Sequence, residues 1–317
     1  MLYLNGHEVE ENFFPNRETY IDIPNFVRNR ADADDNDKDF SLTIGMRFEG
    51  NDDLINLMFL KRHLDDLGYK NVALNVPYFP YSTMDHTDKS RPLSLKYAAE
   101  LINSLGFTKV SCLEPHSTVV EALVNNLDAK MFTAEVVRHA FADRESGIMD
   151  CSAIGRAIEK HGRIFIVYPD AGAAKRYKNL VTHEKTCDLA SYAVSLSWDY
   201  DPIIVMDKER RFSDGKLGAM VPLKPLPEFG EKDFCVIVDD LCRKGRTFTG
   251  CADALRAAGA KHVILCVTHL ERIADHGVLL PDSSVDKVYA TDSCLTASAL
   301  EKLKAECDKL VTVNVDY

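Results

Sequence analysis

Two adjacent carboxylates in the second half of the chain have the surroundings of a sugar-phosphate site. Asp239 and Asp240 follow the apolar run FCVIV at residues 234–238 and precede a short basic turn. Neighbouring carboxylates at a strand end can accept hydrogen bonds from the 2- and 3-hydroxyls of a ribose, and the turn can offer backbone N–H groups and a helix N-terminus to a phosphate. An N-cap aspartate beside a solvated one is the alternative, but the strand before the pair and the helix after it favour a binding site.

Three other polar segments follow predicted strands. His116 comes after one of them, where it either has a structural role or binds a ligand. Asp170 comes after another, where its carboxylate can bind a metal ion or a ribose, or cap the next helix, and Gly172 lets the backbone approach a ligand closely. The third segment is the basic run KERR at residues 208–211, which on its own is typical of a solvated surface.

Alternating helix and strand patterns must position these residues. From about residue 54 the pattern is typical of a layered α/β fold with a largely parallel sheet, in which ligands gather at the carboxyl ends of the strands. Leucines at positions 57, 60, 64 and 67 line one face of a helix that Gly68 can end. Strands are expected at residues 72–76, 110–113, 163–168, 202–206, 234–238 and 262–267, and helices at residues 97–105, after His116, and at 248–258.

The composition limits the class of protein. The 317 residues, 46% of them hydrophobic, allow two ordinary domains with buried cores. A net charge of -11 argues against general binding to nucleic-acid backbones, and no apolar stretch approaches the length of a membrane helix. Nine scattered cysteines without a CxxC pattern, and an N-terminus with acids where a signal peptide has bases, predict a cytoplasmic protein. The acidic run at residues 31–39 is interpreted as a solvated loop, because it lacks the glycine turn and terminal Glu of a calcium loop.

The candidate residues lie in segments that resemble the ribose-phosphate pyrophosphokinase family, the phosphoribosyl pyrophosphate synthetases. VDDLCRKGRT at residues 238–247 is similar to its phosphoribosyl-binding motif, which type I phosphoribosyltransferases share. Further segments resemble other motifs of the family in the same order: FPNRETYIDI (14–23), EGNDDLINL (49–57), PYFPY (77–81), EPHS (114–117), YPDAGAAKR (168–176) and DKERR (207–211). The resemblance therefore covers nearly the whole chain.

The resemblance implies a fold and an activity. The fold would be two stacked phosphoribosyltransferase-like α/β domains with largely parallel sheets, residues 1–134 and 135–317, and the active site would lie between them. The activity would be transfer of the β,γ-diphosphoryl group of Mg-ATP to the anomeric 1-hydroxyl of a ribose 5-phosphate unit, with release of AMP. The implied partners are small-molecule substrates and further copies of the chain, with no nucleic acid and no membrane.

The resemblance also assigns the ATP and metal sites. Phe14 would stack on the adenine of ATP while Asn16 and Glu18 read its polar edge, in the family usually across a subunit boundary. A hairpin turn alone could also explain the Asn and the Glu. His116 would bind Mg²⁺ or an ATP phosphate, and Asp170 would bind the metal. No strong protein base is required, because the metal can acidify the attacking hydroxyl.

The remaining assignments concern catalysis and the sugar phosphate. Lys208 and Arg210 would be the catalytic pair, in a loop after the strand at residues 202–206, where cations stabilise the charge that develops during diphosphoryl transfer. Asp239 and Asp240 would orient the ribose. The phosphate loop would consist of Arg243, Lys244, Gly245, Arg246 and Thr247.

This loop departs from the family's pattern, because Lys244 and Arg246 stand where the family has Thr and Gly. A loop with three cations suits more negative charge, or a phosphate that continues into another group. Two acceptors therefore remain open, ribose 5-phosphate and ADP-ribose, the second giving ADP-ribose 1-diphosphate. If the basic side chains instead point to solvent, only the backbone binds the phosphate.

Other departures lie elsewhere in the chain. Only 13 residues precede the adenine hairpin, which are too few for the family's first strand and helix. Thr83 and Met84 replace an Arg-Gln pair before Asp85, so one cation of the triphosphate site is missing. The stretch at residues 180–200, which contains Trp198, is longer than in the family and is interpreted as a lid or an interface.

Two other functions remain open at this point. A phosphoribosyltransferase that consumes phosphoribosyl pyrophosphate shares the acid pair and the loop, but it should lack the KER segment and the adenine hairpin. A non-catalytic regulatory relative of the pyrophosphokinases is the other alternative. The presence of Lys208, Arg210, His116 and Asp170 argues against it.

Overall fold

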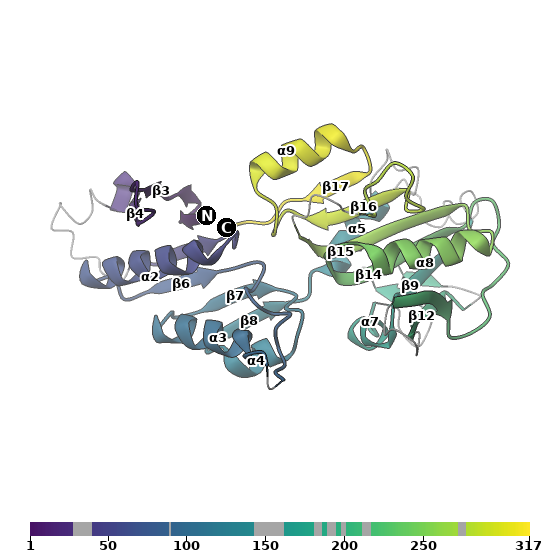
Figure 1. Ribbon diagram of the computed structural model, residues 1–317, viewed down its shortest axis with the longest axis horizontal. Helices are drawn as coiled ribbons and strands as arrows, with labels where there is room; N and C mark the ends of the chain where they lie inside the picture. Colours follow the sequence, from purple (N-terminus) through teal and green to yellow (C-terminus); the bar gives the residue numbers. More distant parts are fainter. Residues whose placement is uncertain are drawn as a thin grey trace. The chain divides into compact units, whose positions relative to one another are not determined.

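The chain forms two compact units in the computed structural model, which describes residues 1–27, 40–88, 90–142, 162–180, 186–188, 195–197, 201–210, 217–271 and 277–317. The first unit comprises Met1–Met131 with Val315–Tyr317, and the second comprises Phe132–Asn314. Each contains a largely parallel sheet with helices, so the predicted α/β class is confirmed (Figure 1). The predicted boundary between residues 134 and 135 lies three residues beyond this division.

Two expectations fall outside the described residues. They are the solvated acidic loop at residues 31–39 and most of the segment at residues 180–200, including Trp198. Among the residues that the structure does describe, no helix is long and apolar enough to cross a membrane.

The first unit is built on a six-stranded sheet in the order β2-β1-β5-β6-β7-β8. Strands β5 to β8 run parallel, and β1 runs antiparallel to β5. A first strand therefore exists before the hairpin, although it is only three residues long. The strands are β1 (Leu2–Leu4), β2 (His7–Glu8), β5 (Leu42–Met46), β6 (Val72–Asn75), β7 (Val110–Leu113) and β8 (Leu127–Lys130), and the helices are α2 (Asn51–Asp66), α3 (Ser94–Ser104) and α4 (Val119–Leu123).

Helix α2 carries the predicted leucine stripe. Leu57, Leu60 and Leu64 are fully buried in the core of the first unit. Gly68 follows the helix with a φ of 86°, a left-handed conformation that favours glycine, so the predicted helix end is confirmed.

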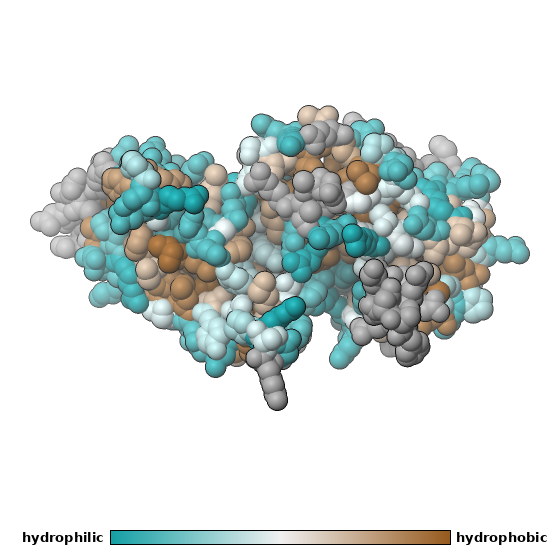
Figure 2. Space-filling model, in the orientation of Figure 1, coloured by the Kyte–Doolittle hydropathy of each residue, from teal (hydrophilic) through white to brown (hydrophobic). Residues whose placement is uncertain are grey.

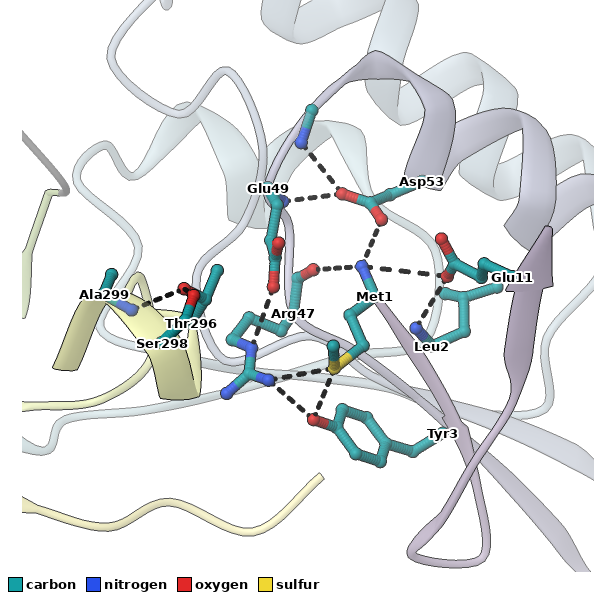
Figure 3. Close-up of polar contacts among 11 residues, drawn as sticks. Met1, Leu2, Tyr3, Glu11, Arg47, Glu49, Asp53, Thr296, Ser298 and Ala299 are labelled. Atoms are coloured by element: carbon teal, nitrogen blue, oxygen red, sulfur yellow. Dashed lines mark hydrogen bonds and ion pairs between the residues drawn. The ribbon is translucent and has the colours of Figure 1, made fainter. Parts of the chain in front are cut away.

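Asp53 fixes the start of α2. Its Oδ2 accepts the N–H groups of Glu49 at 2.6 Å and Gly50 at 2.9 Å, and its Oδ1 pairs with the amino group of Met1. The same amino group donates to the carbonyl of Arg47 at 3.0 Å. Figure 3 shows these contacts, which join the beginning of α2 to the strand β1. A carboxylate in the first turn also complements the helix dipole.

The last residues of the chain pack on the first unit. The amide of Asn75 donates to the carbonyl of Asp316 at 2.8 Å. The ring of Tyr317 stacks on that of Tyr3, with centroids 5.3 Å apart. A Cβ added at Gly45 would lie 2.5 Å from the carbonyl carbon of Tyr317, so this approach requires a glycine in β5.

The second unit is built on a seven-stranded sheet in the order β13-β12-β9-β14-β15-β16-β17. All neighbours are parallel except β12 and β13, which are antiparallel. The strands are β9 (Ile164–Tyr168), β12 (Ile203–Arg210), β13 (Leu217–Pro222), β14 (Phe234–Cys242), β15 (His262–Leu270), β16 (Lys287–Thr291) and β17 (Leu310–Val313), and the helices are α5 (Thr133–Ala142), α7 (Ala171–Arg176), α8 (Arg246–Ala257) and α9 (Ala297–Glu306).

This sheet is covered on both faces, which explains why its central strands are continuously apolar. In β14, Val236 and Val238 belong to a core with residues of α5 and α7. Cys235 and Ile237 alternate with them and belong to a second core with residues of α8. The predicted strand at residues 234–238 is thus confirmed as a doubly covered strand.

Two strands run further than predicted. Strand β12 continues to Arg210 because β13 pairs with it, with Lys208 opposite Met220, so Lys208 and Arg210 lie in a strand and the prediction of a loop is wrong. Strand β14 continues to Cys242 because β15 pairs with it that far, whereas its pairing with β9 ends at Ile237. The acid pair therefore lies at the end of the β9 ladder but inside β14.

Candidate functional site

The carboxylate of Asp170 lies between a helix and a strand. Asp170 is the N-cap of α7, and its Oδ1 accepts the N–H of Ala173 at 3.0 Å. Its Oδ2 pairs with the Nζ of Lys208 at 3.2 Å. The capping alternative is therefore found, together with an ion pair to the candidate catalytic lysine. A Cβ added at Gly172 would lie 3.0 Å from Oδ1, so the small residue makes room for the carboxylate.

The surroundings of Asp170 keep it ionised. Burial alone would raise its pKa, but the backbone N–H of Ala173 and the ammonium of Lys208 outweigh burial, and the pKa lies below its usual value. Both side chains are about one third exposed, at 38% for Asp170 and 32% for Lys208. A charged, accessible carboxylate is thus available at the carboxyl end of β9.

The two acids of β14 differ in their surroundings. Asp240 is buried, and its Oδ2 lies 3.6 Å from Nη1 of Arg176, the last residue of α7. Asp239 is partly exposed, and its Oδ1 accepts the N–H of Asp240 at 3.0 Å. Burial raises the pKa of Asp239 well above its usual value, and the neighbouring carboxyl of Asp240 and the charge of Asp170 add to this.

We refer to these five side chains as the strand-end cluster: Asp170, Arg176, Lys208, Asp239 and Asp240. They come from α7 and from the carboxyl ends of β9, β12 and β14, the edge where α/β sheets bind ligands. The structure thus brings together four residues predicted from the sequence. Arg176 was not predicted as a site residue, and its one signal is its place at the end of YPDAGAAKR.

Cys251 lies near the cluster, and Arg210 lies in the same strand as Lys208. The thiol of Cys251 in α8 is fully buried, and burial raises its pKa to about 12, so it is not a nucleophile at neutral pH. Arg210 has its backbone in β12, while its side chain lies outside the part of the chain that the structure describes. Its predicted catalytic role stays a prediction.

The phosphate loop is short. Gly245 has a φ of 74°, the left-handed conformation that favours glycine, and it is the N-cap of α8. Arg246 and Thr247 form the first turn of α8, so they belong to the helix and not to the loop. Gly245 thus turns the chain so that the N-terminus of α8 follows the acid pair directly, as expected for a phosphate site.

The three cations near this turn are not equivalent. Arg243, Lys244 and Arg246 are all exposed. The Nε of Arg243 lies 3.1 Å from both carboxylate oxygens of Glu271, so its charge is already balanced. Among the described side chains, no ion pair involves Lys244 or Arg246.

The candidate adenine residues lie on a hairpin of the first unit, between β3 (Glu10–Phe13) and β4 (Thr19–Asp22). Phe14 is 51% exposed and available for stacking, and its ring lies 4.8 Å from that of Tyr20. The Oδ1 of Asn16 accepts the N–H of Glu18 at 3.1 Å, so Asn16 stabilises the turn, as the hairpin alternative expects.

The segment around His116 is held in place by strained and buried groups. His116 is partly exposed and follows β7. Glu114 is fully buried and has a φ of 35°, which is uncommon for a residue with a Cβ. The pKa of Asp85 is lowered, because hydrogen bonds from His86 and Ser117 outweigh its burial. Asp85 therefore contacts the EPHS segment.

A divalent cation would have few protein ligands here. Within the described residues, no three His, Cys, Asp or Glu side chains come together as a metal site. Mg²⁺ is usually held by one or two carboxylates together with substrate phosphates and water, and not by a cage of protein ligands. The ionised, partly exposed carboxylate of Asp170 fits such a site.

Comparisons with known proteins agree with this geometry. No protein-family model matches the chain. It is 24% identical over 290 residues to a ribose-phosphate pyrophosphokinase of Bradyrhizobium diazoefficiens, a match that covers 91% of this chain and 78% of the relative. It is 26% identical over 298 residues to one of Thermosipho africanus, with 88% and 83% covered.

A solved structure supports the fold. The crystal structure of phosphoribosylpyrophosphate synthetase from Mycobacterium smegmatis superposes with a TM-score of 0.66 at 17% identity, covering 97% of this chain and 86% of that one. Several pyrophosphokinases thus match over about nine tenths of the sequence, and the same motifs meet in the strand-end cluster. The chain is therefore similar to the ribose-phosphate pyrophosphokinases over most of its length, as its motifs indicate.

Proposed function

We propose that this chain transfers the β,γ-diphosphoryl group of Mg-ATP to the anomeric hydroxyl of a ribose 5-phosphate unit and releases AMP. The similar proteins are ribose-phosphate pyrophosphokinases, which are diphosphotransferases. The observation that supports the reaction is the strand-end cluster, which combines the cation of Lys208 with three carboxyls at one edge of a sheet. Cations near transferring phosphoryl groups and carboxylates near a sugar diol are what this chemistry requires.

The residues of the second unit would have the following roles. Asp239 and Asp240 orient the ribose through its 2- and 3-hydroxyls, while the N-terminus of α8 holds the 5-phosphate. Lys208 and Arg210 stabilise the charge that develops on the diphosphoryl group and on the leaving AMP. Asp170 would hold Mg²⁺, which when bound would supply Lewis-acid stabilisation of phosphate charge and lower the pKa of the attacking hydroxyl.

The residues of the first unit would bind ATP. Phe14 stacks on the adenine, Asn16 and Glu18 read its polar edge, and His116 binds Mg²⁺ or a phosphate oxygen. Residues 1–134 would then form the pyrophosphokinase domain and residues 135–317 the phosphoribosyltransferase-like domain.

The acceptor is either ribose 5-phosphate or ADP-ribose. Lys244 and Arg246 are exposed, and within the described side chains neither forms an ion pair, which supports a second phosphate beyond the 5-phosphate. Arg243 is paired with Glu271, so Lys244 and Arg246 are the cations of this turn that could bind a second phosphate. ADP-ribose therefore stays a second candidate beside the small sugar phosphate.

The test is AMP formation from Mg-ATP with each acceptor, followed by chromatography. Lys208→Ala should lower the rate by about 10²- to 10³-fold, the usual effect of removing one group that stabilises transition-state charge. Lys224→Ala is the matched control, because Lys224 also pairs with an aspartate, Asp201, at 3.7 Å. No AMP with either acceptor would refute the proposal. Consumption of phosphoribosyl pyrophosphate without ATP would identify a phosphoribosyltransferase instead.

We also propose a homo-oligomer in the cytoplasm. Ile55 and Phe59 on α2 are 40% and 43% exposed, and Figure 2 shows hydrophobic residues in brown gathered where α2 and β6 lie. Such an apolar patch supports contact with another copy. The seven cysteines whose side chains are described are free, which agrees with a reducing compartment. Light scattering after size-exclusion chromatography measures the oligomer, and a monomer would contradict it.

A further inference from the structure

Both oxygens of Asp170 are engaged within the protein. Oδ1 accepts the backbone N–H of Ala173 at 3.0 Å as the N-cap of α7. Oδ2 binds the ammonium of Lys208 at 3.2 Å. The first contact caps a helix through its backbone. The second is an ion pair with a side chain, which can change its rotamer without disturbing the helix.

A divalent cation on Asp170 must therefore replace one of these contacts. Mg²⁺ binds carboxylate oxygens at about 2.0–2.1 Å with near-ideal octahedral geometry. Oδ1 is held by the helix cap, where it accepts the backbone N–H of Ala173 at 3.0 Å. Oδ2 contacts a side chain and not the helix backbone, so a cation can bind there without opening the helix cap, and it would repel the ammonium of Lys208 from its present place.

We propose that the ion pair with Asp170 keeps the ammonium of Lys208 away from the diphosphoryl group. A divalent cation that binds to Oδ2 displaces the ammonium, which can then reach that group. The inference rests on the proposed function of the site. It makes Asp170 the residue that couples metal binding to the placement of the catalytic cation. Lys208 lies in β12, paired with β13, so the exchange requires a change in its side chain only.

The experiment measures how fast Lys208 reacts with limiting acetic anhydride, by peptide mass spectrometry, with and without Mg²⁺ alone at constant ionic strength. Lys208 is 32% exposed, so the reagent can reach it. Its labelling rate should rise about two- to fivefold with Mg²⁺, the range expected when a partly exposed ion pair is lost. Lys224, which pairs with Asp201 at 3.7 Å and is 84% exposed, is the internal control and should not respond.

The variant Asp170→Asn separates the proposal from other effects of the metal. Asn can still cap α7, so the helix should stay intact. In this variant Lys208 should label fast without Mg²⁺ and show no response to it. An unchanged or lower rate in the wild type, or an equal rise in the variant, would overturn the proposal.

The labelling is independent of turnover. A protein that forms no AMP but shows metal-dependent labelling of Lys208 would contradict the proposed function alone. A protein that forms AMP while Lys208 labels independently of Mg²⁺ would contradict this inference alone.

Discussion

Replacement of Arg176 by Met should destabilise the second unit by removing the positive charge beside the buried Asp240. The N–O separation is 3.6 Å, and the Asp240 side chain is only 4% exposed. Two unit charges at this separation attract by about 4.6 kcal/mol at an effective dielectric constant of about 20, and by about 2.3 kcal/mol at about 40. The Arg176 side chain is 24% exposed, so water screens part of the attraction. We therefore expect a loss of about 2–4 kcal/mol, near the range for breaking a buried pair.

The assay is urea unfolding followed by circular dichroism, combined with a binding measurement for ribose 5-phosphate. Arg163→Met is the matched control, because Arg163 pairs with the equally buried Asp233 at 2.6 Å before the start of β9. It should lower stability without weakening sugar binding, whereas Arg176→Met should lower both.

A double variant tests the physical reason. Arg176→Met combined with Asp240→Asn removes both charges, so most of the lost stability should return. A loss below about 0.5 kcal/mol in the single variant would refute the reasoning, since changes of that size are usual for surface substitutions. A double variant that is less stable than the single one by the full effect of Asp240→Asn would refute it as well.

Three other substitutions should change the stability of the protein or its amide exchange. Asp239→Asn should stabilise the protein at neutral pH while lowering activity, because the raised pKa of Asp239 means that its ionisation disfavours the folded state. Urea unfolding should show that the variant's gain in free energy of unfolding increases as the pH rises above the unfolded-state pKa of about 3.9. Gly45→Ala should release Tyr317, because its Cβ would lie 2.5 Å from the backbone there, and amide exchange at residues 315–317 should speed up. Thr133→Val should lower the free energy of unfolding by about 1–3 kcal/mol, because it removes a fully buried, hydrogen-bonded hydroxyl. Thr133→Ser keeps the hydroxyl and should retain most of the wild-type stability.

The strands and helices that position the site were predictable from local patterns. The apolar run at residues 234–238 and the leucines of α2 are buried on the faces that their spacing predicts. These patterns succeed because a doubly covered strand and an amphipathic helix each bury a fixed period of side chains. Local sequence therefore contains enough information to place Asp170 and Asp239 at the carboxyl edge of one sheet.

The ends of the strands were not predictable in this way. Residues 207–210 are polar, and they are extended because β13 supplies hydrogen bonds from a later part of the chain. A local pattern cannot show which segment will pair with them. The same holds for Arg176, because a basic residue in the last turn of a helix usually indicates interaction with the helix dipole. Its contact with Asp240 depends on the packing of α7 against β14.

The charges of the strand-end cluster add to the effect of burial on the pKa of Asp239. Asp170 with Lys208, and Asp240 with Arg176, form two ion pairs. Asp239 is the remaining carboxyl of the cluster, and burial and the negative charges of its neighbours raise its pKa. A protonated carboxyl accepts fewer hydrogen bonds than a carboxylate, so a diol that needs two acceptors favours its ionisation. Positive charge brought to the cluster would act in the same direction, because a nearby cation favours the charged form of a carboxyl. The excess of one carboxyl therefore prepares the cluster for a cationic ligand, and the proposed metal ion has this property.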